Sequence, residues 1–165
     1  KKIKKFYKFN NVYELKFKSS KFHTYDRSLL IRKLSDVINV EKPDTLFINY
    51  SGDVHSDHLH VFECCKPFIK SFRYNYIKNV LMMEIISETD QNFLNSKKNF
   101  KPNIFFNVDQ FIKKKCKALS IYKSEIGKNP FPRSKENILA LAKLRGSQSG
   151  SKYAESFMSV KQVIS

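Results

Sequence analysis

The chain has 165 residues, of which 41% are hydrophobic and 14% aromatic, so it is about one domain long and can form a hydrophobic core. This composition excludes a disordered tail, and no apolar run approaches the roughly 18 residues of a membrane span. The formal net charge of +16 would attract phosphate or anionic lipid, and the lysine-rich start lacks the apolar run of a secretory signal, so we expect a cytoplasmic protein.

The first half of the chain predicts a strand, a helix and a second strand. Val12 to Phe17 alternates apolar and polar residues, as a half-buried strand does. Apolar residues at helical spacing predict a helix over 26–40, with Asp26 or Ser28 as its N-cap. The proline of "KPD" ends that helix, and the apolar run over 45–50 is typical of a buried parallel strand. This order predicts a βαβ unit.

The remaining segments extend the alternation of strands and helices. A helix is expected over 60–72, where Pro67 kinks or ends it. Further strands are expected over 79–86 and 103–108, and further helices over 109–126 with Asp109 as N-cap, over 134–146 between Ser134 and Gly146, and over 152–160. The pattern predicts an α/β fold of three layers, Rossmann-like, with a mostly parallel sheet flanked by helices.

The lysine excess has two explanations. A basic surface could hold a nucleic acid or an anionic glycan. Alternatively, an AT-rich coding bias raises Lys, Asn, Ile, Phe and Tyr together and lowers Ala and Gly, which is the composition seen here. The lysines are dispersed apart from clusters at 1–8 and 113–117. Nucleic acid is therefore not the expected partner, and a non-catalytic basic binding module is the alternative to the function below.

The cysteines predict no covalent framework. Cys64, Cys65 and Cys116 are odd in number and lack the C-x-x-C spacing of a cysteine zinc site. The adjacent pair on a predicted helix is expected to pack as small apolar side chains. A reducing compartment fits this usage.

The segment directly after the strand over 45–50 concentrates groups that bind metals. Asp53, His55, Asp57 and His58 form the pattern D-x-H-x-D-H, at the strand end where ligands sit in such sheets. Imidazole and carboxylate suit zinc, and an Asp–His pair often means one ligand and one orienting group. A nearby histidine can instead act on the substrate. The other interpretation is a solvated loop with Asp57 as an N-cap.

The stretch "KPDTLFINYSGDVHSDHLHVF" (42–62) resembles the second signature of the LmbE/PIG-L family of zinc-dependent de-N-acetylases. The segments 84–90 and 100–108 are similar to later family segments, with Asn107 where aspartate is usual. Residues 122–157 resemble the ending of sugar de-N-acetylases, including the type in bacillithiol synthesis. The resemblance covers about 12–157 of a single domain, 1–165. It implies Zn²⁺ as cofactor and an N-acetylglucosamine-type sugar or glycoconjugate as substrate.

The resemblance implies roles for individual residues. His58 would be a zinc ligand, and His55 would stabilise the oxyanion or protonate the leaving amine. Asp57 would be a catalytic-site residue that orients a ligand, whereas Asp53 and Gln148 would lie beside the substrate.

Two other residues near these motifs have less specific expectations. His60 matches no functional position of the family and is expected on a helix face. Arg145 would contact either substrate or an acid such as Glu155.

One part of the family pattern does not occur in these residues. The signature A-H-P-D-D-E, which supplies the other metal ligands and the general base, is absent, and His23 lacks neighbouring aspartates. We therefore expect the chain to be a truncated form of the domain, without its opening strands, and to be inactive alone. A separately encoded N-terminal half could complete the site, and a homo-oligomer is possible in principle.

Overall fold

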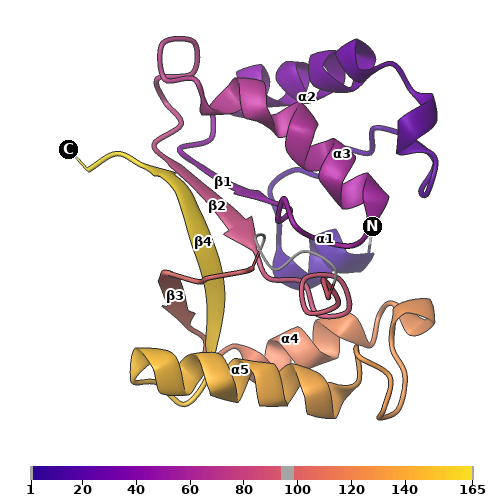
Figure 1. Ribbon diagram of the computed structural model, residues 1–165, viewed down its shortest axis with the longest axis vertical. Coiled ribbons are helices and arrows are strands. Elements are labelled where there is room, and N and C mark those ends of the chain that lie inside the picture. The colour runs from indigo at the N-terminus through magenta and orange to yellow at the C-terminus, as the bar shows by residue number, and fades with distance from the viewer. Residues whose placement is uncertain (1, 94–98, 165) are drawn as a thin grey trace. The chain divides into compact units, whose positions relative to one another are not determined.

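The computed structural model describes residues 2–93 and 99–164 (Figure 1). The chain divides into two compact units, which are described separately: unit 1 comprises residues 1–14 and 105–156, and unit 2 comprises residues 15–104 and 157–165. The helices of the described residues are α1 (Lys2–Tyr7), α2 (Arg27–Glu41), α3 (Ser56–Cys65), α4 (Ile112–Leu119) and α5 (Lys135–Ser149), with single 3₁₀ turns at Phe22–Thr24, Lys66–Ile69 and Lys123–Glu125. The strands are β1 (Thr45–Ile48), β2 (Asn79–Met83), β3 (Ile104–Asn107) and β4 (Ala154–Gln162).

The four strands form one mixed sheet in the order β1-β2-β4-β3. β1 and β2 are parallel, with Thr45 opposite Asn79, and the intervening α3 makes them the βαβ unit of this chain. β4 pairs antiparallel with β2, with Met83 opposite Phe157. The α/β class with a sheet and flanking helices is therefore confirmed.

Two predicted elements are wrong. Residues 12–17 form no strand, because an alternating segment needs a partner strand and Lys16 has a backbone φ of 58°, outside the extended region. The segment 152–160, expected as a helix, belongs largely to β4. Pairing with β2 decides its conformation, which a short segment cannot reveal by itself.

The helices agree with prediction more closely than the strands. α2 begins after Asp26, whose carboxylate accepts from the Ser28 amide at 2.8 Å, as expected. α5 begins after Ser134 as predicted, but it continues through Gly146 to Ser149. A Cβ at Gly146 would lie 2.7 Å from the Lys152 carbonyl oxygen, so this glycine permits close packing and does not end the helix.

The two other predicted helices begin at different residues than expected. α3 starts at Ser56, four residues earlier, and gives way at Lys66 to a 3₁₀ turn that contains Pro67. The N-cap of α4 is Phe111, whereas the Asp109 carboxylate accepts from the Tyr153 amide at 2.6 Å. That competing hydrogen bond explains why Asp109 does not cap the helix.

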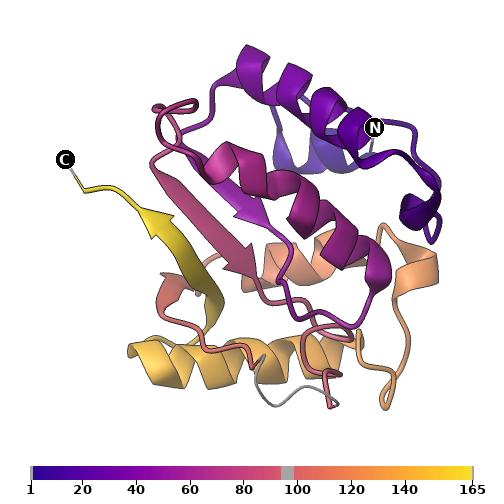
Figure 2. The same ribbon diagram turned by 45° about the horizontal axis from the view of Figure 1, so that its top comes forward.

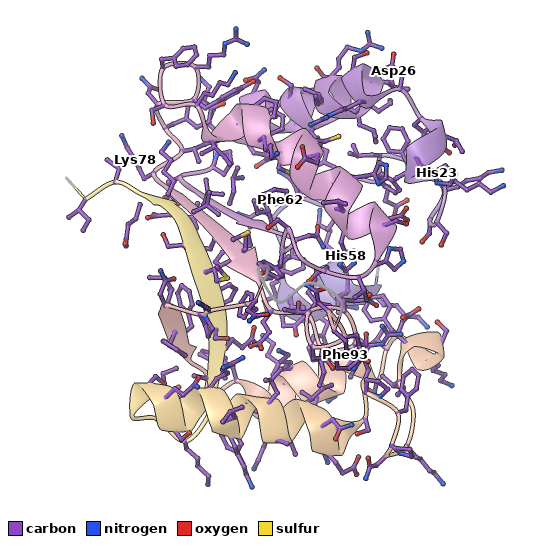
Figure 3. The ribbon with its side chains drawn as sticks, viewed as in Figure 1. His23, Asp26, His58, Phe62, Lys78 and Phe93 are labelled. Atoms are coloured by element: carbon purple, nitrogen blue, oxygen red, sulfur yellow. The ribbon has the colours of Figure 1, made fainter. Side chains whose placement is uncertain are left out.

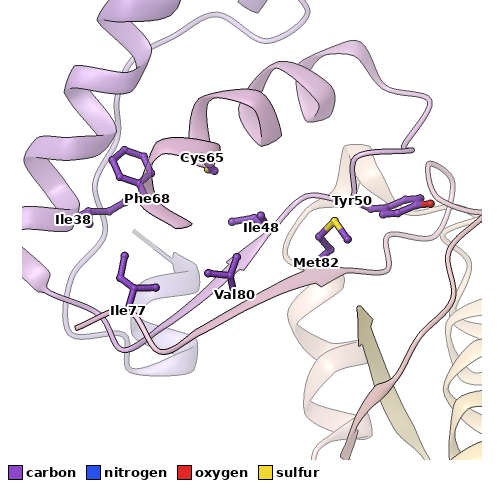
Figure 4. Packing of buried hydrophobic residues seen from close by; sticks show 8 residues of the cluster. All are labelled: Ile38, Ile48, Tyr50, Cys65, Phe68, Ile77, Val80 and Met82. Atoms are coloured by element: carbon purple, nitrogen blue, oxygen red, sulfur yellow. The ribbon is translucent and has the colours of Figure 1, made fainter. Parts of the chain in front are cut away.

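The core of unit 2 lies between the two strands of the βαβ unit and the helices α2 and α3, which lie together beside them (Figure 2). Phe68, Ile77 and Val80 are completely buried there, and Cys65 packs as a small apolar group with them, as predicted (Figure 4). Burial, and then the neighbouring Cys64, raise the pKa of the Cys65 thiol to about 12. No helix among the described residues combines the length and apolar character that a membrane crossing requires.

Candidate metal and catalytic site

The predicted site begins with a tight turn at the carboxyl end of β1. The Asp53 amide donates to the Tyr50 carbonyl at 3.3 Å, which folds the chain back at this point. A Cβ at Gly52 would lie 2.5 Å from Cε1 of the Tyr50 ring, so only glycine fits beneath that ring. The turn directs the Asp53 side chain toward the first turn of α3.

His58 and Asp53 form a buried histidine–carboxylate pair. Nδ1 of His58 lies 2.8 Å from Oδ2 of Asp53, whose side chain is completely buried, whereas 23% of the His58 side chain is exposed. Because a carboxylate oxygen only accepts, Nδ1 of His58 donates, and its Nε2 keeps a lone pair. This arrangement, a carboxylate that orients an imidazole through its remote nitrogen, is the one found behind histidine ligands of metals. His58 lies in the first turn of α3 (Figure 3).

The turn that follows β2 holds the second oxygen of this carboxylate. The Thr89 hydroxyl donates to Oδ1 of Asp53 at 2.6 Å and accepts from the Ile85 amide at 2.9 Å. The Val54 amide donates to the Glu88 carbonyl at 3.3 Å, which ties the same two loops together. Both oxygens of Asp53 therefore have partners, and the orientation of the His58 ring is fixed from the neighbouring strand.

Burial raises the pKa of Tyr50, and the charge of Asp53 raises it further. A phenolate beside a buried carboxylate would be unfavourable, so Tyr50 stays a neutral wall of the turn. Its ring contacts Phe100 edge-on, with centroids 5.2 Å apart. The site therefore rests on a rigid aromatic base.

His55 is the N-cap of α3 and has the opposite hydrogen-bonding role. Its Nδ1 accepts from the Asp57 amide at 3.1 Å, so neutral His55 carries its proton on Nε2. The His55 and His58 rings are nearly parallel, with centroids 5.0 Å apart and planes at 23°. The structure thus brings together a lone pair on one imidazole and an N–H donor on the other.

Asp57 has a different partner from the one expected. Its carboxylate accepts from the Ser20 amide at 2.5 Å and from the Phe22 amide at 3.4 Å, so it holds the segment before α2. The orienting contact to His58 comes from Asp53, which was expected beside the substrate. A catalytic role of Asp57 stays a prediction.

The remaining predicted residues lie in several elements. His60 donates from Nδ1 to the Ser56 carbonyl at 2.8 Å, in keeping with a helix-face residue. Arg145 donates to the Gln148 side-chain oxygen at 2.9 Å, and both lie on α5 in unit 1. Glu155 pairs with Lys115 at 3.0 Å. Substrate contact by Gln148 stays a prediction.

The donor set fits one side of a metal site. Among residues 2–93 and 99–164, no three His, Cys, Asp or Glu side chains converge as a metal ligand set. His58 offers one prepared nitrogen, and Asp53 serves it from behind. Sequence reasoning missed Thr89, although polar residues after the neighbouring parallel strand were a signal that could have indicated it.

Comparison with solved structures reveals the same fold in proteins of low sequence identity. N,N'-diacetylchitobiose deacetylase from Pyrococcus horikoshii matches with a TM-score of 0.71 and 14% identity over 97% of this chain and 61% of its own. The conserved protein TT1542 from Thermus thermophilus matches with 0.73 and 17% over 99% and 72%. GalB, a 4-carboxy-2-hydroxymuconate hydratase from Pseudomonas putida KT2440, matches with 0.63 and 17% over 86% and 61%.

These matches define the fold of the chain and leave its reaction open. No family model matches the sequence. The chain spans about three fifths of the length of the deacetylase, at 61%.

Proposed function

We propose that this chain is the part of an LmbE/PIG-L-type de-N-acetylase that supplies one zinc ligand and one oxyanion-stabilising group. The proposed substrate is an N-acetylglucosamine-type sugar or glycoconjugate, whose acetamide bond is hydrolysed. The observation that carries the proposal is the His58–Asp53 pair at 2.8 Å, which leaves Nε2 of His58 as a prepared ligand. The deacetylase among the structures of this fold supports the same reaction class.

The hydratase among the fold neighbours shows why the fold alone does not decide the chemistry. Hydration and amide hydrolysis both use an activated water, so the choice depends on site residues. The D-x-H-x-D-H pattern and its resemblance to the de-N-acetylase signature favour hydrolysis. The parallel His55 ring adds an N–H donor of the kind that an amide hydrolase needs for its oxyanion.

Each residue of the site has a defined task in this proposal. Zinc, when bound, supplies Lewis-acid chemistry for the acetamide carbonyl and for the attacking water. Nε2 of His58 holds the ion, while Asp53 and Thr89 keep that ring in one tautomer. Nε2–H of His55 donates to the oxyanion that develops on the carbonyl. The remaining ligands and the general base come from polypeptide outside these 165 residues.

The experiment compares variants in the chain alone and together with the product of the coding region directly upstream. The chain alone is expected to bind zinc weakly and to release no measurable acetate from N-acetylglucosamine, because one ligand does not hold a catalytic zinc. In the combined protein, His58→Ala abolishes metal retention. His55→Ala keeps the metal and lowers the rate about 100- to 1,000-fold, as loss of an oxyanion donor does.

His60→Ala is the matched control, because His60 lies on the same helix and bonds only its own backbone turn in the contacts seen here. It is expected to keep both metal and rate. Equal loss of zinc in the His55 and His58 variants would overturn the assignment, as would a tight single zinc site in calorimetry of the chain alone.

A further inference from the structure

The positive charge is concentrated in unit 1. Its 66 residues contain sixteen Lys and Arg against five Asp and Glu, a net charge of +11. The 99 residues of unit 2 contain fifteen against ten, a net charge of +5. A uniform coding bias would spread the excess over both units in proportion to their length. The distribution therefore needs a second explanation.

The fold brings the two lysine clusters of the sequence together within unit 1. The ammonium of Lys114 on α4 lies 5.3 Å from the Tyr7 ring centroid and 5.9 Å from that of Phe6, both on α1. These cation–π contacts place the basic helix of residues 112–119 beside the basic helix of residues 2–7. The exposed lysines of this surface are Lys2, Lys4, Lys5, Lys8, Lys113, Lys114 and Lys117.

Aromatic rings accompany these lysines. The Phe9 ring stacks on Tyr7 with centroids 5.4 Å apart and planes at 20°, and 48% of Phe9 is exposed. Phe111, at the start of α4, is 58% exposed. Flat exposed rings among lysines are the combination that binds single-stranded nucleic acids, because bases stack on the rings while ammonium groups meet the phosphates.

The apolar side of α4 makes a membrane surface the weaker alternative. Ile112 and Ala118 are buried, and α4 packs against α5 within the same unit. An interfacial helix inserts its apolar face into lipid, and here that face is already covered. The lysine face is what remains available. The one acidic group paired on this helix is Glu155, which binds Lys115 at 3.0 Å and not the outer lysines in that contact.

We infer that α1 and α4 form a binding surface for single-stranded nucleic acid, with the exposed lysines on phosphates and Phe9 stacked on a base. This surface lies wholly in unit 1 and does not depend on the proposed hydrolase site in unit 2. The structure thereby gives a place to the basic binding module that the sequence offered as an alternative.

The test measures binding of the full 165-residue chain to a fluorescein-labelled oligouridylate of about 20 nucleotides by anisotropy. The variant Lys113→Glu/Lys114→Glu/Lys117→Glu is expected to bind at least about tenfold more weakly and to lower the slope of log K against log salt by about 2. The control Lys33→Glu/Lys70→Glu/Lys78→Glu reverses three exposed charges in unit 2 and is expected to change binding by less than about threefold.

Phe9→Ala separates stacking from charge. It is expected to weaken binding to the single strand about fivefold and to leave binding to a duplex unchanged. If the glutamate variant has an altered circular dichroism spectrum, the glutamine variant at the same three lysines replaces it. Equal losses in the unit 1 and unit 2 variants would overturn the inference, and so would tighter binding to phosphatidylglycerol vesicles than to the oligonucleotide.

Discussion

The imidazoles of His55 and His58 lie nearly parallel, 5.0 Å apart, yet their Nδ1 atoms have opposite roles. Nδ1 of His58 donates to a buried carboxylate, whereas Nδ1 of His55 accepts from the backbone amide of Asp57. The outer nitrogens are therefore opposite as well: His58 presents a lone pair and His55 an N–H. A ligand for a cation and a donor for an anion thus stand side by side at the start of one helix.

Thr89→Val tests the support of the buried carboxylate. The change removes the hydroxyl that donates to Asp53 at 2.6 Å, leaves one carboxylate oxygen without that partner, and keeps the side-chain shape. The free energy of unfolding is expected to fall by about 1–3 kcal/mol, measured by urea denaturation. Thr24→Val removes an exposed hydroxyl and is the control, with an expected change below about 0.5 kcal/mol. Equal effects in the two variants would contradict this role of Thr89.

Asp57→Ala tests the tether between α3 and the segment before α2. The Ser20 and Phe22 amides lose their acceptor, so their hydrogen exchange is expected to accelerate in NMR spectra. The Asp53–His58 hydrogen bond does not involve Asp57 and is expected to persist. Asp36→Ala, an exposed change on α2, should leave both amides as protected as in the original chain. A lost His58 signal in Asp57→Ala alone would instead support the orienting role first expected of Asp57.

Cys65 makes the stability depend on alkaline pH. Its pKa is raised to about 12 in the fold from a model value of 9.0, so between these values the unfolded chain releases a proton that the folded chain keeps. The free energy of unfolding is therefore unaffected by this group below pH 9 and falls as the pH rises from 9 toward 12. Cys65→Ala should flatten that part of the profile relative to the original chain. An unchanged alkaline slope in the variant would contradict the assignment.

The sequence predicts local features of the fold well and tertiary ones poorly. The α2 cap depends on Asp26 and an amide two residues away, so it could be predicted. β4 depends on hydrogen bonds to β2, and β2 lies about 80 positions earlier in the chain, at the register Met83 opposite Phe157. A short apolar segment fits a helix or a strand until its partner is known.

The candidate site shows the same division. The spacing of the histidines identified His58 as the metal-binding candidate, but the choice between Asp53 and Asp57 as its orienting group needed the geometry of the turn. Thr89 is 36 positions from Asp53, and parallel pairing of β1 with β2 brings their loops together. Sequence spacing alone does not contain that distance.

The most direct test of the central claim is a long-range ¹H–¹⁵N NMR spectrum of the histidine side chains, recorded during titration with Zn²⁺. The account predicts that neutral His58 carries its proton on Nδ1 and neutral His55 on Nε2, and that added zinc shifts Nε2 of His58 before any nitrogen of His55 or His60. A His58 proton on Nε2, or a first zinc-induced shift at His60, would contradict it.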